Sequence, residues 1–214
     1  MRKILDKIKN EGFFVILIKL IKLILLKTIR FSWTKLIISE YLLEEPVKEI
    51  EPKDPFIIRE AVEDDLNKLK EIVSEKKGEL FKERFKKGRV CFIALDGEKA
   101  VFFHWIAMED EESAFSPYEG CHFILKLGRG EAYLYDGFTA PEYRQKGLHT
   151  SVKTKMLKYL KDKGFKKVFV CVTSDNTFSR KSNAKAGFKG KKIVHFITLL
   201  GFKFQIWRNF TGTL

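Results

Sequence analysis

Residues 141–150 read Pro-Glu-Tyr-Arg-Gln-Lys-Gly-Leu-His-Thr, from Pro141 to Thr150, and they join an apolar run to an amphipathic one. The preceding run, 131–139, has the aromatic content of a strand, and 147–162 has apolar side chains at helical spacing. A strand, a tight turn with Gly147 and a helix start gather backbone N–H groups at one point, where the helix adds a partial positive charge. With Arg144 and Lys146 nearby, this turn is a candidate pyrophosphate cradle, although a plain connection is the alternative.

The remaining chain after residue 55 alternates short apolar runs with turn signals and helical patterns. Asp96-Gly97 between two apolar runs predicts a hairpin, and Gly187 ends the last helical pattern. This mixture predicts an α+β fold in which helices flank a mixed sheet. The expected strands are 56–59, 90–95, 100–108, 121–127, 131–139, 167–173, 193–200 and 202–207, and the expected helices are 61–75, about 80–85, 147–162 and 176–185.

Two motifs in this region resemble those of one enzyme family. The run Pro141-x-x-Arg144-x-x-Gly147-x-His149 resembles the acetyl-CoA-binding motif of the GCN5-related N-acetyltransferase (GNAT) superfamily. The run from Asn176 to Phe188 resembles its second hallmark, a helix that begins at asparagine and ends in Lys-x-Gly-Phe. The resemblance covers about 56–208 and implies a GNAT-like acyl-CoA N-acyltransferase domain.

The resemblance also implies roles for named residues. Backbone N–H groups of the turn would hold the pyrophosphate of acetyl-CoA, and the end of strand 131–139 would pair with the pantetheine amides like an added strand. The sheet would splay between 131–139 and 167–173, and the cosubstrate would enter that gap. The implied cofactor-binding residues are Phe138, Thr139, Arg144, Gln145, Lys146, Gly147, Leu148, His149, Thr150 and Asn176.

Three positions depart from the family pattern. His149 replaces the usual small residue, so its side chain must point away from the pyrophosphate. Gln145 stands where glycine is common, and Asn183 stands where many members have the tyrosine that protonates the thiolate. Thiolate protonation must therefore come from another group or from solvent.

Three residues are candidates for the acid–base chemistry of amine acetylation. A primary amine is mostly protonated at neutral pH, so a base would assist its attack. Asp136 is the first candidate, because strand alternation puts it on one face with the apolar Leu134 and Phe138. The alternative is that Asp136 pairs with a lysine or lies at a frayed edge. His104 could serve instead as the base, and Tyr135 could donate to the thiolate or orient the substrate.

Residues 1–43 form the most apolar and most basic part of the chain. They hold nine Lys/Arg against three Asp/Glu, whereas the whole chain has a net charge of +13. Lys19 and Lys22 interrupt the apolar run, and this interruption argues against a signal peptide. Each of the two lysines would also oppose insertion of a transmembrane helix by roughly 2.5–3.5 kcal/mol. The pattern predicts an amphipathic helix at an anionic membrane interface; packing on the following domain, on a second subunit as a homodimer, or a true span are the alternatives.

The chain therefore divides into three predicted parts. An amphipathic segment, 1–43, is followed by a Pro-rich linker, 44–55, which holds three of the five prolines and should be extended, and by the acyltransferase domain, 56–210. The three cysteines are far apart without metal-ligand spacing, so no metal site is expected, and they indicate a reducing, cytoplasmic compartment. No basic helix with interleaved aromatics supports a nucleic-acid partner.

The function predicted from these features is transfer of an acetyl group from acetyl-CoA to a primary amine by direct attack. The amphipathic segment would hold the enzyme peripherally at the cytoplasmic face of the inner membrane, which would suit a membrane-bound acceptor. The alternative is a non-catalytic acyl-CoA-binding module, suggested by Asn183 in place of tyrosine. Neither the acceptor amine nor the acyl chain length follows from the sequence.

Overall fold

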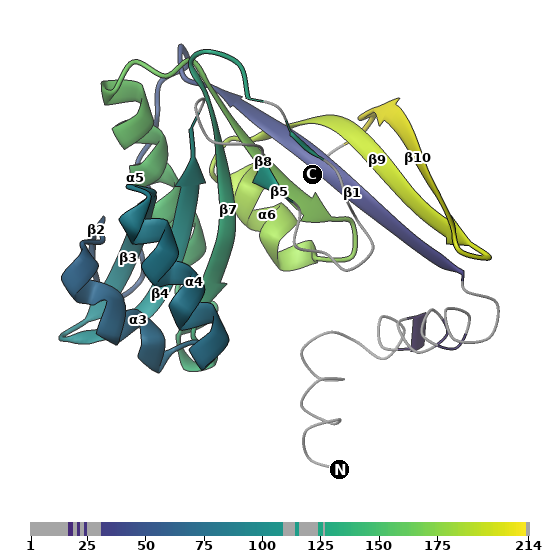
Figure 1. Ribbon diagram of the computed structural model, residues 1–214. Coiled ribbons are helices and arrows are strands. Elements are labelled where there is room, and N and C mark those ends of the chain that lie inside the picture. The colour runs from purple at the N-terminus through teal and green to yellow at the C-terminus, as the bar shows by residue number, and fades with distance from the viewer. Residues whose placement is uncertain are drawn as a thin grey trace.

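The computed structural model describes residues 17, 18, 21, 24, 31–108, 114–115, 124–125 and 127–212. Its main sheet has eight strands in the order β10-β9-β1-β8-β7-β4-β3-β2, and a two-stranded sheet pairs β5 with β6 (Figure 1). In the large sheet β7 and β8 are parallel, and the other neighbours are antiparallel. The strands are β1 Ser32–Leu42, β2 Ile57–Glu60, β3 Val90–Asp96, β4 Lys99–Ala107, β5 Ala114–Phe115, β6 Ile124–Leu125, β7 Glu131–Thr139, β8 Lys167–Thr173, β9 Lys189–Leu199 and β10 Phe202–Asn209.

Four helices flank this sheet: α3 Leu66–Glu71, α4 Glu75–Lys86, α5 Leu148–Asp162 and α6 Thr177–Lys185. Side chains of β4 alternate between the two faces. Phe102 joins α5 residues in one core cluster, whereas Phe103 and Trp105 join Phe81 of α4 in another. This mixed sheet with flanking helices is the α+β architecture that the sequence predicts.

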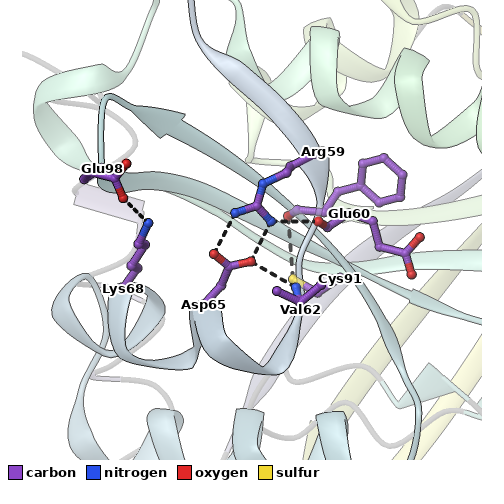
Figure 2. Close-up of polar contacts among 8 residues, drawn as sticks. Arg59, Glu60, Val62, Asp65, Lys68, Cys91 and Glu98 are labelled. Carbon is purple, nitrogen blue, oxygen red and sulfur yellow. Dashed lines mark hydrogen bonds and ion pairs between the residues drawn. The ribbon is translucent and has the colours of Figure 1, made fainter.

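The start of α3 is fixed by a buried carboxylate (Figure 2). Both oxygens of Asp65 accept hydrogen bonds from Arg59 of β2, at 2.6 and 2.8 Å, and one also accepts from the N–H of Val62 at 2.9 Å. The hydrogen bonds from Arg59 lower the pKa of Asp65. A bidentate pair of this kind holds the start of α3 against the edge of the sheet.

The sequence-based assignment of 1–43 to one amphipathic helix is wrong for residues 32–42. They form β1, which lies in the sheet between β9 and β8 with Leu36, Ile37 and Ile38 buried. The sheet therefore begins before the predicted domain boundary, and 44–55 crosses from β1 to β2 without regular structure. Most of 1–30 lies outside the described residues, so the amphipathic helix stays a prediction. No helix in the described part of the chain is long and apolar enough to cross a membrane.

A strand pair of 121–127 with 131–139, which the turn Gly128-Arg129-Gly130 between these two apolar runs predicts, is corrected by the structure. Where this first segment is described, as β6, it pairs with β5, and β7 pairs instead with β4 and β8. The expected helix over 61–75 is shorter, because it consists of a 3-10 turn over Glu63–Asp65 followed by α3. Residues 109–112 are all acidic and predict an exposed loop, which lies outside the described residues.

Candidate functional site

The turn between β7 and α5 presents a row of unused backbone donors. Thr139 ends β7, a 3-10 turn covers Pro141–Tyr143, and Gly147 precedes α5. Gln145 has φ +66 and Gly147 has φ +87, the left-handed region that favours glycine. In the described part of the chain, the N–H groups of 145–149 donate no hydrogen bond. Five free donors at a helix start are chemically suited to an anion.

The Pro-rich segment braces this turn. The N–H of Lys53 donates to the carbonyl of Lys146 at 3.0 Å, and the Lys146 ammonium pairs with Asp54 at 2.8 Å. Further along, the N–H of Ile50 donates to Thr154 Oγ1 of α5 at 3.2 Å. Residues 50–54 are thus bound to the turn and helix rather than acting as a free linker. Arg144 is exposed and has no ion pair among the described residues, so it is available to an anion.

The sheet splits beside the turn. The ladder between β7 and β8 runs only from Glu131–Lys167 to Leu134–Val170, although both strands continue, to Thr139 and Thr173. On its other edge β7 still pairs with β4, with Phe138 opposite Phe103 and Thr139 opposite Phe102. The edge of residues 136–139 that faces β8 therefore has no ladder partner among the described strands. An extended amide-bearing chain could add to this edge.

Asn176 borders the same gap from the other side. It follows β8, and its Oδ1 accepts from the N–H of Ser179 at 3.1 Å, which caps the start of α6. This hydrogen bond fixes the side chain at the end of the strand that forms one wall of the gap. Its side-chain nitrogen Nδ2 remains free to donate, since no hydrogen bond from this atom is present in the described part of the chain.

A β-bulge in β7 lies where the two strands separate. Two residues, Asp136 and Gly137, stand opposite the single residue His104 of β4, and Asp136 has φ +51. The bulge breaks the alternation on which the sequence analysis relied. Leu134 packs in the α5-side core, whereas Phe138 packs in the α4-side core. Asp136 therefore shares no common face with both of these residues.

The carboxylate of Asp136 joins the bulge to α4. Oδ1 accepts from Lys77 Nζ and Oδ2 accepts from Arg84 Nη1, both at 2.6 Å. Arg84 also lies over the rings of Trp105 and Tyr135, at 5.0 and 4.9 Å from their centroids. A carboxylate whose two oxygens each bind a cation is better suited to fixing α4 on the bulge than to accepting a proton.

We expect Asp136→Asn to lower the free energy of unfolding by about 2–3 kcal/mol, because it leaves two cations facing each other in a partly buried site. Asparagine tolerates a positive φ as well as aspartate does, so the backbone is not the cause. Urea denaturation measures the effect, with Glu98→Gln as the control, since Glu98 is an exposed partner of Lys68 and should cost under about 0.5 kcal/mol. Equal losses in both variants would contradict this role of Asp136.

On the α5 side of the bulge lies a polar cluster of four residues: His104, Lys153 and Asn183 are buried, and His149 is half-buried. The imidazole of His149 stacks on that of His104 with centroids 5.6 Å apart, and it lies 5.7 Å from the ring of Phe102. The His149 side chain thus points into the core, away from the free N–H groups of the turn, as the motif requires. Lys153 Nζ lies 3.4 Å from His149 Nδ1 and donates to Asn183 Oδ1.

This cluster holds a cation without a carboxylate partner. Lys153 is 2% exposed, and burial lowers the pKa of its ammonium to about 7. Burial, and next the charge of Lys153, hold the pKa of both His104 and His149 well below the usual value. In the described part of the chain Lys153 has no ion pair, and His104 Nδ1 has no hydrogen-bond partner. The cluster is therefore ready to bind or protonate an anion.

Sequence reasoning missed Lys153, although a signal exists. Lys153 follows His149 by four residues and precedes Met156 by three and Leu160 by seven, which is the spacing of one helix face. Met156 and Leu160 are fully buried, so this lysine lies on the core side of α5. A lysine at an apolar position of a helix is costly unless it has a function.

A pocket of about 550 Å³ opens on the opposite, α4 side of the bulge. Its walls are the α3–α4 connection, with Ile72, Val73 and Ser74, and the end of β7, with Phe138. Lys77, the cation held by Asp136, also lines it. The core clusters place α4 and α5 on opposite faces of the sheet, so the pocket and the polar cluster lie on opposite sides of β7.

The acetyltransferase (GNAT) family model matches residues 56–188, more than half of the chain. None of the curated proteins matches the sequence. Among solved structures, a GCN5-related N-acetyltransferase from Sphaerobacter thermophilus is 12% identical, with a TM-score of 0.58 over 83% of this chain and 56% of its own. A GNAT-family acetyltransferase from Colwellia psychrerythraea is 15% identical, with a TM-score of 0.51 over 78% and 55%.

A conserved protein of unknown function from Staphylococcus epidermidis is similar in the same way. It is 12% identical and has a TM-score of 0.52 over 81% of this chain and 66% of its own. The chain thus spans between about half and two thirds of the length of these three structures. At these identities the likeness shows a shared fold alone.

Proposed function

The chain belongs to the acetyltransferase (GNAT) family, and we propose that it transfers an acetyl group from acetyl-CoA to a primary amine. The observation that carries the proposal is the row of free N–H groups at 145–149 beside the unpaired edge of β7. The free N–H groups suit a pyrophosphate, and the unpaired strand edge suits a chain of amides. CoA carries both groups next to each other, as its pyrophosphate and its pantetheine arm.

The residues present fit acetyl-CoA, which would supply an activated acetyl group as its thioester. The turn would hold the pyrophosphate through the N–H groups of 145–149, with Arg144 as an added cation. The backbone of Phe138 and Thr139 would pair with pantetheine, and the amide of Asn176 would approach it from β8. The ammonium of Lys146 is paired with Asp54, so we assign Lys146 two roles: it holds the turn against residues 50–54, and it adds positive charge beside the pyrophosphate.

The acceptor amine would enter through the pocket between the α3–α4 connection and the end of β7. This pocket is open to solvent and meets β7 at Phe138, beside the bulge. The proton that the attacking amine loses can pass to water there. Asp136 would act indirectly, by holding Lys77 and α4 at the pocket wall.

Lys153 would protonate the thiolate that leaves when the carbon–sulfur bond breaks. Its Nζ donates to the side chain of Asn183, the position where many family members have their tyrosine acid. An ammonium with a pKa of about 7 is protonated in a large part of the molecules at neutral pH and gives up its proton readily. Lys153 would then regain a proton from solvent after the products leave.

A non-catalytic acyl-CoA-binding module is the second candidate, and the absence of a tyrosine at Asn183 favours it. The two are distinguished by following thiol release from acetyl-CoA with a chromogenic thiol reagent, in the presence of polyamines, lysine peptides and amino sugars. Release that depends on an amine and is lost in Gly147→Glu supports the enzyme. Binding of acetyl-CoA without release above the amine-free rate for every amine supports the module.

A further inference from the structure

The end of the sheet farthest from α3, α4 and α5 carries exposed apolar side chains. It consists of the first residues of β1 and the β9–β10 hairpin, which extend away from the helices in Figure 1. Every residue of β10, the edge strand, is exposed. The large apolar side chains here are between 43% and 70% exposed. They are Trp33, Leu199, Leu200, Phe202, Phe204, Ile206 and Trp207.

Most of these side chains lie on one face, which we call the hairpin face: Trp33, Leu199, Phe202, Phe204 and Ile206. The pairing register places them together. Trp33 of β1 is opposite Ile197 of β9, which is opposite Phe204, and Leu199 is opposite Phe202. An apolar cluster of this kind on an edge hairpin normally meets a partner.

The turn of the hairpin places an apolar residue in a strained backbone conformation. It has Leu200 at φ +50 and Gly201 at φ +90, and such a pair of positive φ angles favours Asn-Gly. A leucine in the left-handed region costs roughly 1–2 kcal/mol, and its side chain is 66% exposed. The chain therefore keeps an exposed apolar side chain at the tip at a conformational cost, which points to a function for the tip.

The hairpin itself carries only positive charge. Residues 189–209 contain five Lys/Arg and no Asp or Glu, and no acid occurs between Glu11 and Glu40. Glu40 and Glu45 pair with Lys191 and Lys189, but the other cations of β1, β9 and β10 have no ion pair among the described residues: Lys35, Lys192, Lys203 and Arg208. The positive charge also affects His195: burial is the main cause that lowers its pKa, and the charges of Lys35 and Arg208 lower it further.

We propose that the hairpin face and its tip insert into the interface of an anionic lipid bilayer. Exposed phenylalanine, tryptophan and leucine suit the boundary between headgroups and acyl chains, and unpaired cations around them suit anionic headgroups. The sequence that enters β1 continues this chemistry, since 13–30 is apolar with Lys19, Lys22, Lys27 and Arg30. A second protein copy would need acidic groups to offset these cations, and the hairpin offers none.

The test uses the full chain and vesicles of phosphatidylcholine with or without phosphatidylglycerol, separated by flotation. Wild-type protein should bind the anionic vesicles, less so as salt is raised. Leu200→Asn should reduce the vesicle partition coefficient about fivefold, and adding Phe204→Thr should reduce it more than about twentyfold. Because Asn-Gly relieves the turn, Leu200→Asn should keep or raise the melting temperature, so unfolding cannot explain the lost binding.

Ile57→Thr is the matched control, because Ile57 is 56% exposed on β2, the opposite edge of the same sheet. It should leave the partition coefficient unchanged. Three results would overturn the proposal. The first is no binding to anionic vesicles, and the second is equal binding by wild type and Leu200→Asn, which would assign the attachment to residues 1–30. The third is a wild-type dimer in sedimentation velocity that both hairpin variants dissociate, without vesicle binding.

Discussion

Replacement of Gly147 by glutamate should weaken acetyl-CoA binding more than about 100-fold, which corresponds to about 2.7 kcal/mol. Gly147 has φ +87, which any side chain would strain, and it lies in the middle of the row of free N–H groups. A carboxylate at this point would repel the pyrophosphate and would move the donors that face it. Calorimetric titration of the full chain with acetyl-CoA measures the loss.

The chain offers a matched control at the other end of α5. Gly164 has φ +81, and a side chain added there meets nothing within 4 Å. Gly164→Glu therefore adds the same charge and a similar backbone strain to the same helix, but far from the turn. It should bind acetyl-CoA within about twofold of wild type. If both variants lose binding equally, the loss comes from strain in α5 and not from the turn.

Replacement of Lys153 by methionine should lower kcat by about 100- to 1000-fold, while acetyl-CoA affinity changes less than about threefold. Methionine fills the same space without the proton. In the wild type, kcat should also fall as pH rises through about 7, because the ammonium loses its proton. Lys155→Met is the control, since Lys155 lies on the same helix but pairs with Glu49 and Glu51 at its surface. Unchanged kcat in Lys153→Met would remove Lys153 from the mechanism.

The same substitution has a stability signature with a defined sign. The pKa of Lys153 falls from an ordinary 10.5 to about 7 on folding, so between these pH values the unfolded chain binds more protons than the native one. Stability from this group therefore rises with pH across that window, by up to about 1.4 kcal/mol per pH unit, and is constant below pH about 7. Urea denaturation at pH 7.5 and 9.5 should show wild type gaining roughly 2 kcal/mol or more relative to Lys153→Met.

Local sequence patterns predicted the elements around the turn, since they depend on neighbours in the chain. The amphipathic pattern of 147–162 predicted α5, Gly147 predicted the turn before it, and the apolar run 167–173 predicted β8. The splay of the sheet, implied by the family resemblance, is present at Leu134. The helix and the turn are encoded by residues close together in sequence, whereas the splay depends on the pairing of two separate strands.

Long-range pairing and irregular backbone escaped prediction. Strand β1 pairs with β8 and β9, which follow it by more than a hundred residues, so nothing near Leu36 shows that its apolar run is a central strand. A fragment beginning at residue 44 would lack this strand, which is why the experiments use the full chain. The bulge at Asp136 adds one residue to β7, and alternation counted across it fails. Lys153 was missed for a different reason, since its spacing from Met156 and Leu160 already placed it on the buried face of α5.

The most direct test of the account is a calorimetric titration of the full chain with acetyl-CoA. The free N–H groups of 145–149 and the open edge of β7 predict one binding site per chain with a dissociation constant in the micromolar range. Free CoA should compete with acetyl-CoA for this site, because both molecules carry the same pyrophosphate and pantetheine groups. A folded chain that shows no heat of binding at millimolar acetyl-CoA would contradict the account, because the turn would then be a connection without a ligand.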